Sequence, residues 1–238
     1  NKIDFMKNVL CTICMRGGSK GVANKNILKI NNKPLLYYTI KQAKKSKLFD
    51  NIIVSTDSLK IANLSIKFGA KCWFKRPKYL SDDKAGKLNV IKHALLESEK
   101  HFNKKFDIII DLDATAPLRN VSDIQKAYNK FVKDKSNNLI TATIAKKNPY
   151  FNQIQFKKNQ YDVVVKQRTL PQRRQDAPKV YDMNASIYIW KRNFLLKSNT
   201  IFTSKTSLFI MPPERSCDID NKLDFKFVEY MMKRKNRL

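Results

Sequence analysis

Histidine and long apolar runs are scarce in this sequence of 238 residues. The two histidines, His93 and His101, leave little material for a Ser–His or Cys–His nucleophilic mechanism. Any catalysis is therefore expected to work by positioning and charge neutralisation. No run approaches the roughly 18 apolar residues of a membrane span, and the basic start lacks the apolar region of a signal peptide. We expect a soluble, cytoplasmic protein.

Cysteine is also too sparse for a disulfide framework or a structural zinc site. The four are Cys11, Cys14, Cys72 and Cys217. Cys11 and Cys14 form one C-x-x-C, but they fall inside an apolar run predicted to be a strand, where their side chains point to opposite faces. A second pair at zinc spacing is missing. We expect buried thiols in a reducing compartment.

Acidic residues are few: 20 Asp and Glu stand against 48 Lys and Arg, giving a formal net charge of +28. Such an excess is typical of proteins that bind nucleic acid, anionic membranes or anionic substrates. The lysines are scattered, and no Lys/Arg block is interleaved with aromatic residues as a single-strand groove requires. An anionic substrate is favoured, with no membrane or nucleic-acid partner, and a basic nucleic-acid-binding protein is the alternative.

Glycine is rare but clustered. Three of the five glycines, Gly17, Gly18 and Gly21, directly follow the apolar run at 9–14. Glycine permits positive φ and close backbone approach, which a loop needs if its N–H groups surround an anion. The flanking cations are Arg16, Lys20 and Lys25. The spacing fits neither a Walker loop nor G-x-G-x-x-G, so the pattern predicts another kind of polyphosphate-binding loop; a basic turn without a ligand is the alternative.

The remaining apolar pattern alternates between strands and helices. Strands are predicted at 9–14, 51–55, 71–74, 106–112, 138–145, 186–190 and 207–211, and helices at 34–48, 58–68, 87–101, from 122, and at 223–232. This alternation predicts an α/β fold with a doubly wound, mostly parallel, Rossmann-like sheet. Ligands bind beyond the carboxyl ends of such strands, so the loops after residues 14, 55, 74 and 112 should converge on one cleft.

Residues 146–182 break this pattern. Short strand-like pieces at 153–156 and 162–166 are separated by polar turns, and Arg168, Arg173 and Arg174 lie in the same region. We interpret the chain as a single domain, 1–238, with 146–182 inserted as a β-rich arm. The arm is expected to reach over the cleft or across a dimer partner.

Two carboxylate pairs are candidates for a magnesium site, because magnesium takes one or two carboxylates together with phosphate oxygens. Asp218 and Asp220 point to the same side of an extended segment with Ile219 toward the core, and Asp111 and Asp113 do so at a strand end. Spacing does not decide between the pairs. Asp224 is better explained by helix capping.

Several ordered segments together resemble the acylneuraminate cytidylyltransferase (CMP-sialic acid synthetase) family. They are Arg16-Gly-Gly-Ser-Lys-Gly21, Lys25-Asn26, Val54-Ser-Thr-Asp57, Arg76-Pro77, Thr115-Ala-Pro-Leu-Arg119, Asn184-Ala-Ser-Ile-Tyr188 and Asp218-Ile-Asp220, which span nearly the whole chain. The resemblance implies a dimeric, magnesium-dependent nucleotidyltransferase that joins CTP to a nine-carbon 2-keto sugar acid (a nonulosonic acid) and releases pyrophosphate.

The resemblance also implies site residues. The nucleotide positions fall on Arg16, Gly17, Gly18, Ser19, Lys20, Lys25, Asn26, Arg76 and Lys87, and the metal positions on Asp218 and Asp220. The sugar-acid positions fall on Asp113, Thr115, Arg174, Asn184, Tyr188 and Phe202, partly presented by the arm of the other subunit. We expect Arg16, Lys20 and Lys25 to neutralise the phosphates, while Asp220 or a base at the metal accepts the proton of the attacking hydroxyl.

One departure from the family pattern concerns the sugar. Where sialic acid enzymes typically show Leu-Gln-Pro-Thr-Ser-Pro-Leu-Arg, this chain has Leu112-Asp-Ala-Thr-Ala-Pro-Leu-Arg119, so the carboxylate of Asp113 replaces an amide. Lys87 matches a serine near the cytidine. With 181–186, this segment looks most like the legionaminic acid branch; N-acetylneuraminate or another 2-keto sugar acid is the alternative.

Overall fold

A six-stranded sheet forms the centre of the protein in the computed structural model, which describes residues 8–18, 21–82, 85–169 and 171–235. In spatial order the strands are β10 (Thr206–Ile210), β6 (Asn138–Ile144), β9 (Tyr181–Lys191), β5 (Ile108–Leu112), β1 (Val9–Cys14) and β4 (Asn51–Ser55). Five strands run in the same direction, and β9 is antiparallel to β5 and β6. The expected mostly parallel sheet is confirmed.

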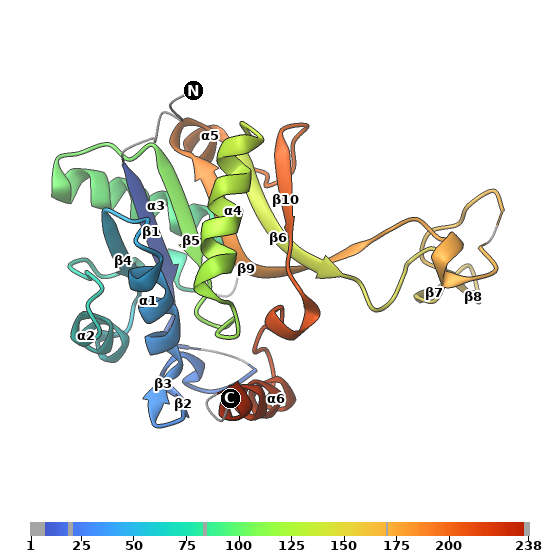
Figure 1. Ribbon diagram of the computed structural model, residues 1–238, viewed down its shortest axis with the longest axis horizontal. Coiled ribbons are helices and arrows are strands. Elements are labelled where there is room, and N and C mark those ends of the chain that lie inside the picture. The colour runs from blue at the N-terminus through green and yellow to red at the C-terminus, as the bar shows by residue number, and fades with distance from the viewer. Residues whose placement is uncertain (1–7, 19–20, 83–84, 170, 236–238) are drawn as a thin grey trace.

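Helices cover both faces of this sheet (Figure 1). On one face lie α1 (Leu35–Ser46), α2 (Leu59–Lys67) and α4 (Val121–Lys133), and on the other α3 (Lys87–Phe102) and α5 (Arg192–Lys197). The alternation of β1 shows why. Cys11 and Ile13 pack with Leu36 of α1, whereas Leu10 packs with Ile91 of α3. The predicted doubly wound α/β fold is confirmed.

The same alternation separates the two cysteines of the C-x-x-C. Cys11 packs on the α1 face and Cys14 on the α3 face, and all four cysteines of the chain are free. The prediction that they form no framework is confirmed. Among the described residues, no helix is both long and apolar enough to cross a bilayer.

The predicted strand at 71–74 is wrong. Only Lys71 pairs, in an isolated bridge with Ile53, so β4 is the edge of the sheet. The aromatic residues that follow pack against α3 instead. Trp73 stacks on His101 with ring centroids 4.1 Å apart, and Phe74 meets His93 edge-on. Because these rings gain burial on a helix, the chain leaves the sheet after one bridge.

The arm is a two-stranded hairpin, β7 (Ile154–Lys157) and β8 (Gln160–Val163), that projects away from the body (Figure 1). Its second strand begins two residues earlier than predicted. Lys158 and Asn159 both have positive φ, 52° and 59°, which makes a tight two-residue hairpin turn. Strand β9 then returns from the arm into the middle of the sheet and is longer than the predicted 186–190.

The last helix, α6 (Lys222–Lys235), packs beside the small hairpin of β2 (Lys29–Ile30) and β3 (Lys33–Pro34) at one end of the molecule (Figure 1). Val228 and Met232 share a cluster with Ile30 and Ile219. The Asp224 carboxylate accepts hydrogen bonds from the N–H groups of Asp220 and Asn221, both at 2.9 Å, which confirms its predicted capping role. Helix α6 therefore holds 218–220 against the glycine-rich loop.

Short 3₁₀ helices complete the described chain. They are η1 (Lys25–Ile27), η2 (Lys78–Leu80), η3 (Arg174–Asp176) and η4 (Pro213–Arg215). Two of them matter for the site, because η1 follows the glycine-rich loop and η3 lies on the arm.

Candidate active site

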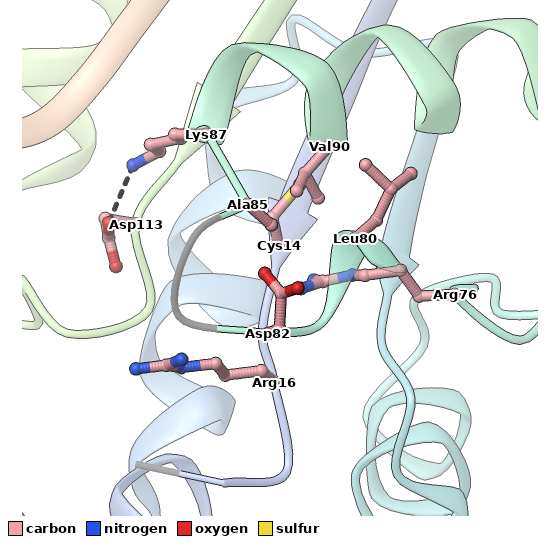
Figure 2. Close-up of a pocket in the computed structure, with 9 residues that line it drawn as sticks. All are labelled: Cys14, Arg16, Arg76, Leu80, Asp82, Ala85, Lys87, Val90 and Asp113. Atoms are coloured by element: carbon pink, nitrogen blue, oxygen red, sulfur yellow. Dashed lines mark hydrogen bonds and ion pairs between the residues drawn. The ribbon is translucent and has the colours of Figure 1, made fainter. Parts of the chain in front are cut away.

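A pocket of about 270 Å³ opens at the carboxyl ends of β1 and β5. Arg16 and Cys14 come from the end of β1, Arg76 and Asp82 from the segment between α2 and α3, and Asp113 from the end of β5; Leu80, Ala85, Lys87 and Val90 complete the lining. Figure 2 shows Arg16 and Lys87 both extending toward the side on which Asp113 lies. The segments after residues 14, 74 and 112 thus meet here as predicted, whereas the loop after residue 55 does not line this pocket.

The glycine-rich loop is held by contacts that need small residues. The N–H of Gly17 donates to Asp57 Oδ1 at 2.8 Å, which joins the ends of β1 and β4. A Cβ on Gly21 would lie 1.9 Å from the carbonyl oxygen of Asp220, so no other residue fits there without movement. Of the two properties expected of these glycines, close approach is the one that applies to Gly21, since among the described glycines only Gly69 has a positive φ. Ser19 and Lys20 lie outside the described residues.

Lys25 and Asn26 tie the far end of the loop to both neighbouring segments. Lys25 Nζ contacts the carbonyl of Ile219 and lies 3.5 Å from Asp220 Oδ1, while Asn26 donates to the carbonyl of Arg16 at 3.2 Å. The N–H of Ile219 in turn donates to the carbonyl of Thr115 at 3.0 Å. The loop, the acidic segment and the turn after β5 thus form one structure.

Asp113 is held ionised by its surroundings. Its Oδ1 accepts from Thr115 N at 3.0 Å and Thr115 Oγ1 at 2.7 Å, and its Oδ2 lies 2.7 Å from Lys87 Nζ. Burial opposes ionisation, but the Lys87 charge and these hydrogen bonds outweigh it and hold the pKa of Asp113 well below its usual range. The guanidinium of Arg119, 1% exposed, fixes the turn by donating to the carbonyls of Ser186 (2.6 Å) and Asp113 (3.3 Å).

The surroundings of Asp218 shift its pKa in the opposite direction from that of Asp113. Burial first, and then the negative charge of Asp113, raise the pKa of Asp218, although a hydrogen bond from Thr115 acts against them. Its Oδ1 is buried and has no hydrogen-bond partner in the described part of the chain. A buried carboxylate oxygen without a donor is a costly arrangement that a cation would relieve. Asp220 adds a second carboxylate nearby, 76% exposed.

This donor set fits magnesium. The ion takes oxygen ligands and keeps water and phosphate oxygens beside one or two carboxylates. Within 8–18, 21–82, 85–169 and 171–235, no group of three or more His, Cys, Asp or Glu residues could hold a metal alone, so substrate oxygens or water would have to complete the coordination. The other candidate pair, Asp111 and Asp113, already has Lys87 as its counter-ion at 3.3 and 2.7 Å. The geometry therefore favours Asp218 and Asp220.

Arg76 lines the pocket but points its donors into the protein. It is 5% exposed, Nε donates to Ser55 Oγ and Nη2 to the carbonyl of Met15, both at 3.1 Å, and Nη2 also reaches the carbonyl of Ser55. Through Nε and Nη2, Arg76 thus joins the ends of β1 and β4, and its expected role at the nucleotide stays a prediction.

Of the six residues expected at the sugar, Asp113 lines this pocket within one chain, and the other five, Thr115, Arg174, Asn184, Tyr188 and Phe202, do not. Asn184 is buried and bonded to Thr141 (2.7 Å) and Ser216 (3.0 Å), which supports the segment leading to Asp218. Arg174 lies on the arm and donates to the carbonyl of Ala145 at 2.6 Å. Phe202 lies between α5 and the amino-terminal end of β10 and is not part of this pocket's lining, so its placement at the sugar stays a prediction.

Sequence reasoning missed two residues that organise the site. Asp57 was counted in a helix-capping cluster, yet Ser58 is the N-cap of α2 and Asp57 anchors Gly17. Thr12 donates to the buried Asp111 at 2.7 Å. The signal for Asp57 was present in the match of Val54-Ser-Thr-Asp57; Thr12 has none, because only strand pairing brings it opposite Asp111.

Comparison with known proteins agrees with this geometry. A family model described as "Cytidylyltransferase" matches residues 10–235. The chain is 51% identical over 231 residues to the CMP-N,N'-diacetyllegionaminic acid synthase of Campylobacter jejuni, covering 97% of each. It is 51% identical over 232 residues to post-translational flagellin modification protein B of Campylobacter coli, again covering 97% of each.

A less similar cytidylyltransferase and a solved structure also resemble this chain. The pseudaminic acid cytidylyltransferase of Campylobacter jejuni is 35% identical over 230 residues, which is 96% of this chain and 97% of that protein. The solved structure of a CMP:2-keto-3-deoxy-manno-octonic acid synthetase shares the fold, with a TM-score of 0.70 at 15% identity over 96% of this chain and 99% of that chain. The chain therefore belongs to the cytidylyltransferase family and is a nucleotidyltransferase enzyme.

Proposed function

We propose that the protein joins CTP to a nine-carbon 2-keto sugar acid of the legionaminic type, giving the CMP-sugar and pyrophosphate. The observation that carries this proposal is the contact of the glycine-rich loop with 218–220 through Gly21 and Lys25, beside the Asp113 carboxylate. That contact puts cations for a triphosphate next to oxygen donors for a metal. The 51% identity to a CMP-N,N'-diacetyllegionaminic acid synthase along 97% of the chain supports the choice of sugar.

In the proposed reaction the anomeric 2-hydroxyl of the sugar acid attacks the α-phosphorus of CTP in line. The new bond joins the sugar oxygen to that phosphorus, the bond to the β-phosphate oxygen breaks, and pyrophosphate leaves. Arg16, Lys20 and Lys25 neutralise the phosphates, with Lys25 nearest the acidic segment. Asp220 and a base at the metal remain the two candidates for accepting the hydroxyl proton.

Magnesium would be held by Asp218 and Asp220 in this proposal. When bound, it supplies positive charge that stabilises the triphosphate and the departing pyrophosphate. Asp218 supports the assignment, because its buried Oδ1 has no hydrogen-bond donor among the described residues and a cation would satisfy it.

A homodimer completes the sugar side of the site in this proposal. The arm projects from the body (Figure 1). It carries Arg174, in η3, which does not line the pocket of its own chain. Its apolar residues are solvent-exposed in the single chain; Phe156 is 63% and Tyr161 73% exposed. Exposed apolar surface of this kind is typical of a protein interface. We place the reaction in the cytoplasm.

Pyrophosphate release tests the proposal. The protein is assayed with each of the four ribonucleoside triphosphates against N,N'-diacetyllegionaminic, N-acetylneuraminic, pseudaminic and 3-deoxy-octulosonic acids. Of the four triphosphates, we expect only CTP to support pyrophosphate release. Of the four acids, we expect the legionaminic acid to give the highest kcat/KM. No release with CTP and any acid would overturn the function, whereas a preference for another acid would overturn only the choice of sugar.

The alternative of a basic nucleic-acid-binding protein makes a different prediction. For binding to a phosphate backbone, the logarithm of the binding constant falls linearly with the logarithm of the salt concentration. A nucleotide site instead distinguishes CTP from ATP at a fixed salt concentration. Titration of a duplex and of CTP over the same salt range separates the two.

A further inference from the structure

Asp111 is a carboxylate buried in the middle of the sheet. Its residue is 0% exposed, and the strand register places it between Thr12 of β1 and Tyr188 of β9. Thr12 Oγ1 donates to Asp111 Oδ1 at 2.7 Å, but Oδ2 has no hydrogen-bond partner in the described residues. Burial of a charge is unfavourable unless a counter-ion is fixed nearby, so Asp111 needs one.

Lys87 is that counter-ion, and its position is constrained from several sides. As the first residue of α3, it brings Nζ to 3.3 Å from Asp111 Oδ2 and 2.7 Å from Asp113 Oδ2. The same ammonium lies 4.8 Å from the ring centroid of Tyr188, within the range of a cation–π interaction. Burial acts against the charge of Lys87, but the two aspartates outweigh it and raise its pKa above the usual range.

This arrangement directs the Lys87 ammonium to two carboxylates. Of its three donors, one is used in the hydrogen bond to Asp113, and the Asp111 carboxylate lies 3.3 Å away. These contacts favour a role of Lys87 beside Asp113 over the role at the nucleotide that the family pattern implied. Its interactions lead to Asp113, the carboxylate on the pocket wall (Figure 2).

Among the contacts of the described residues, Asp113 keeps one acceptor position unused. A carboxylate offers about four. Thr115 uses two of them, both on Oδ1, and Lys87 uses one on Oδ2. The side chain is 21% exposed, so the remaining position on Oδ2 is open to a ligand. A group at that position must donate an O–H or N–H.

We propose that Lys87 and Asp111 are positioning residues for the sugar-acid half of the site. Asp111 holds Lys87, Lys87 orients Oδ2 of Asp113, and Asp113 selects a sugar acid that donates a hydroxyl or amide hydrogen there. The inference rests on the proposed function. It adds to that function which residues orient the Asp113 carboxylate toward the sugar acid.

The test compares Lys87→Met and Lys87→Arg, with Lys92→Met as the control. Lys92 lies on the same helix, but its Nζ donates to the carbonyl of Ser198, away from the pocket. We expect Lys87→Met to raise KM for the sugar acid about 10- to 100-fold, the range for losing a hydrogen bond to a charged group. The Kd for CTP, measured by calorimetry, should stay within about twofold, because Lys87 does not contact the nucleotide in this scheme. Lys87→Arg should restore part of the loss.

Asp111→Asn tests whether Asp111 holds Lys87 in place. It keeps the shape and the contact with Thr12 but removes the charge, so it should raise the same KM. In the Lys87→Met background it should raise KM no further, since Asp111 acts through Lys87. If Lys87→Met fails to fold, as thermal unfolding would show, Lys87→Arg and Asp111→Asn still decide the question.

The outcomes are distinct. A Lys87→Met protein with weaker CTP binding and unchanged KM for the sugar acid would overturn the inference and return Lys87 to the nucleotide. If the effects of Lys87→Met and Asp111→Asn on KM for the sugar acid add in the double variant, Asp111 does not act through Lys87, and that part of the inference fails. If the unaltered protein turns over no sugar acid with CTP, the proposed function itself fails, and this inference with it.

Discussion

Gly21 is the residue on which the contact between the loop and 218–220 depends. Replacing it with alanine would place a Cβ 1.9 Å from the carbonyl oxygen of Asp220, so the two segments must separate. We expect Gly21→Ala to lower kcat about 100-fold or more, because misplacing groups by 1 Å has costs of this order. The measurement is steady-state pyrophosphate release.

Gly86→Ala is the matched control for this substitution. A Cβ there meets nothing within 4 Å, and its φ of −63° suits alanine. Its turnover should equal that of the unaltered protein. Equal activity of Gly21→Ala would show that the loop and the acidic segment need not touch.

Lys25 lies at the same contact from the other side, 15% exposed and 3.5 Å from Asp220. We expect Lys25→Ala to lower kcat about 100- to 1000-fold, the effect of removing one electrostatic donor at a transition state. Lys29→Ala, four residues on in β2, is the control and should leave kcat unchanged. Full turnover by Lys25→Ala would remove Lys25 from the mechanism.

At the scale of elements, α3 and α5 are joined by one ion pair. Arg192 donates to both oxygens of Glu99 at 2.6 and 2.8 Å, and Glu99 also accepts from the N–H of Phe106 at 3.1 Å. Although burial acts against it, the hydrogen bond from Arg192 leads the interactions that lower the pKa of Glu99. Its contribution to stability is therefore present above the unfolded pKa of about 4.3 and is lost as pH falls through the lower folded value.

Glu99→Gln should accordingly lower the free energy of unfolding by about 1 kcal/mol at pH 7, since partial exposure screens the pair. The difference between the two proteins should shrink as pH falls below about 4.3, where the unfolded state takes up the proton, and should be lost below the lower folded pKa of Glu99, where both states are protonated. Urea unfolding at several pH values measures it. Glu97→Gln on the same helix is the control, and a difference that grows toward acid would contradict the assignment.

Helix α6 carries cations and aromatic residues together on one exposed face. We expected no cations interleaved with aromatic residues, but the 3.6-residue period gathers Lys226, Phe227, Tyr230, Lys233 and Arg234 on one exposed face. Arg234 stands over the Tyr230 ring, with its Cζ 5.9 Å from the centroid. The salt titration against a duplex therefore examines a real surface of this chain.

For the whole molecule, we expect the arm to set the oligomeric state. If its exposed apolar side chains form the dimer interface, the double variant Phe156→Ser/Tyr161→Ser should be monomeric, since two large buried rings would be lost from that contact. Light scattering after size-exclusion chromatography measures the mass. The thermal midpoint of the body should change little, because β7 and β8 pair only with each other among the described strands.

Leu96→Ser is the control, because Leu96 is 50% exposed on α3, away from the arm. It should leave the mass unchanged. A dimer that survives the loss of both arm residues would move the interface to another part of the chain.

The sequence by itself determined most elements of this protein and the composition of the site. Strand ends at Cys14, Ser55 and Leu112 were predicted because local periodicity and flanking turn residues encode them. The loop glycines, Lys25 and the Asp218–Asp220 segment were identified from residue type and from the family resemblance. The meeting of the segments after β1 and β5 at one sheet edge followed from the rule for parallel sheets, whereas the contact of 218–220 with the glycine-rich loop is seen only in the structure.

Only the tertiary structure decided how the charged groups pair. Lys87 and Asp113 are 26 residues apart, and Arg76 turns inward to carbonyls of two strands, neither of which a local pattern encodes. The antiparallel course of β9, the loss of the strand at 71–74 and the place of Phe202 likewise depend on which surfaces pack together. Such pairings are set by long-range burial, where an unpaired charge is costly, and not by the propensities of neighbouring residues.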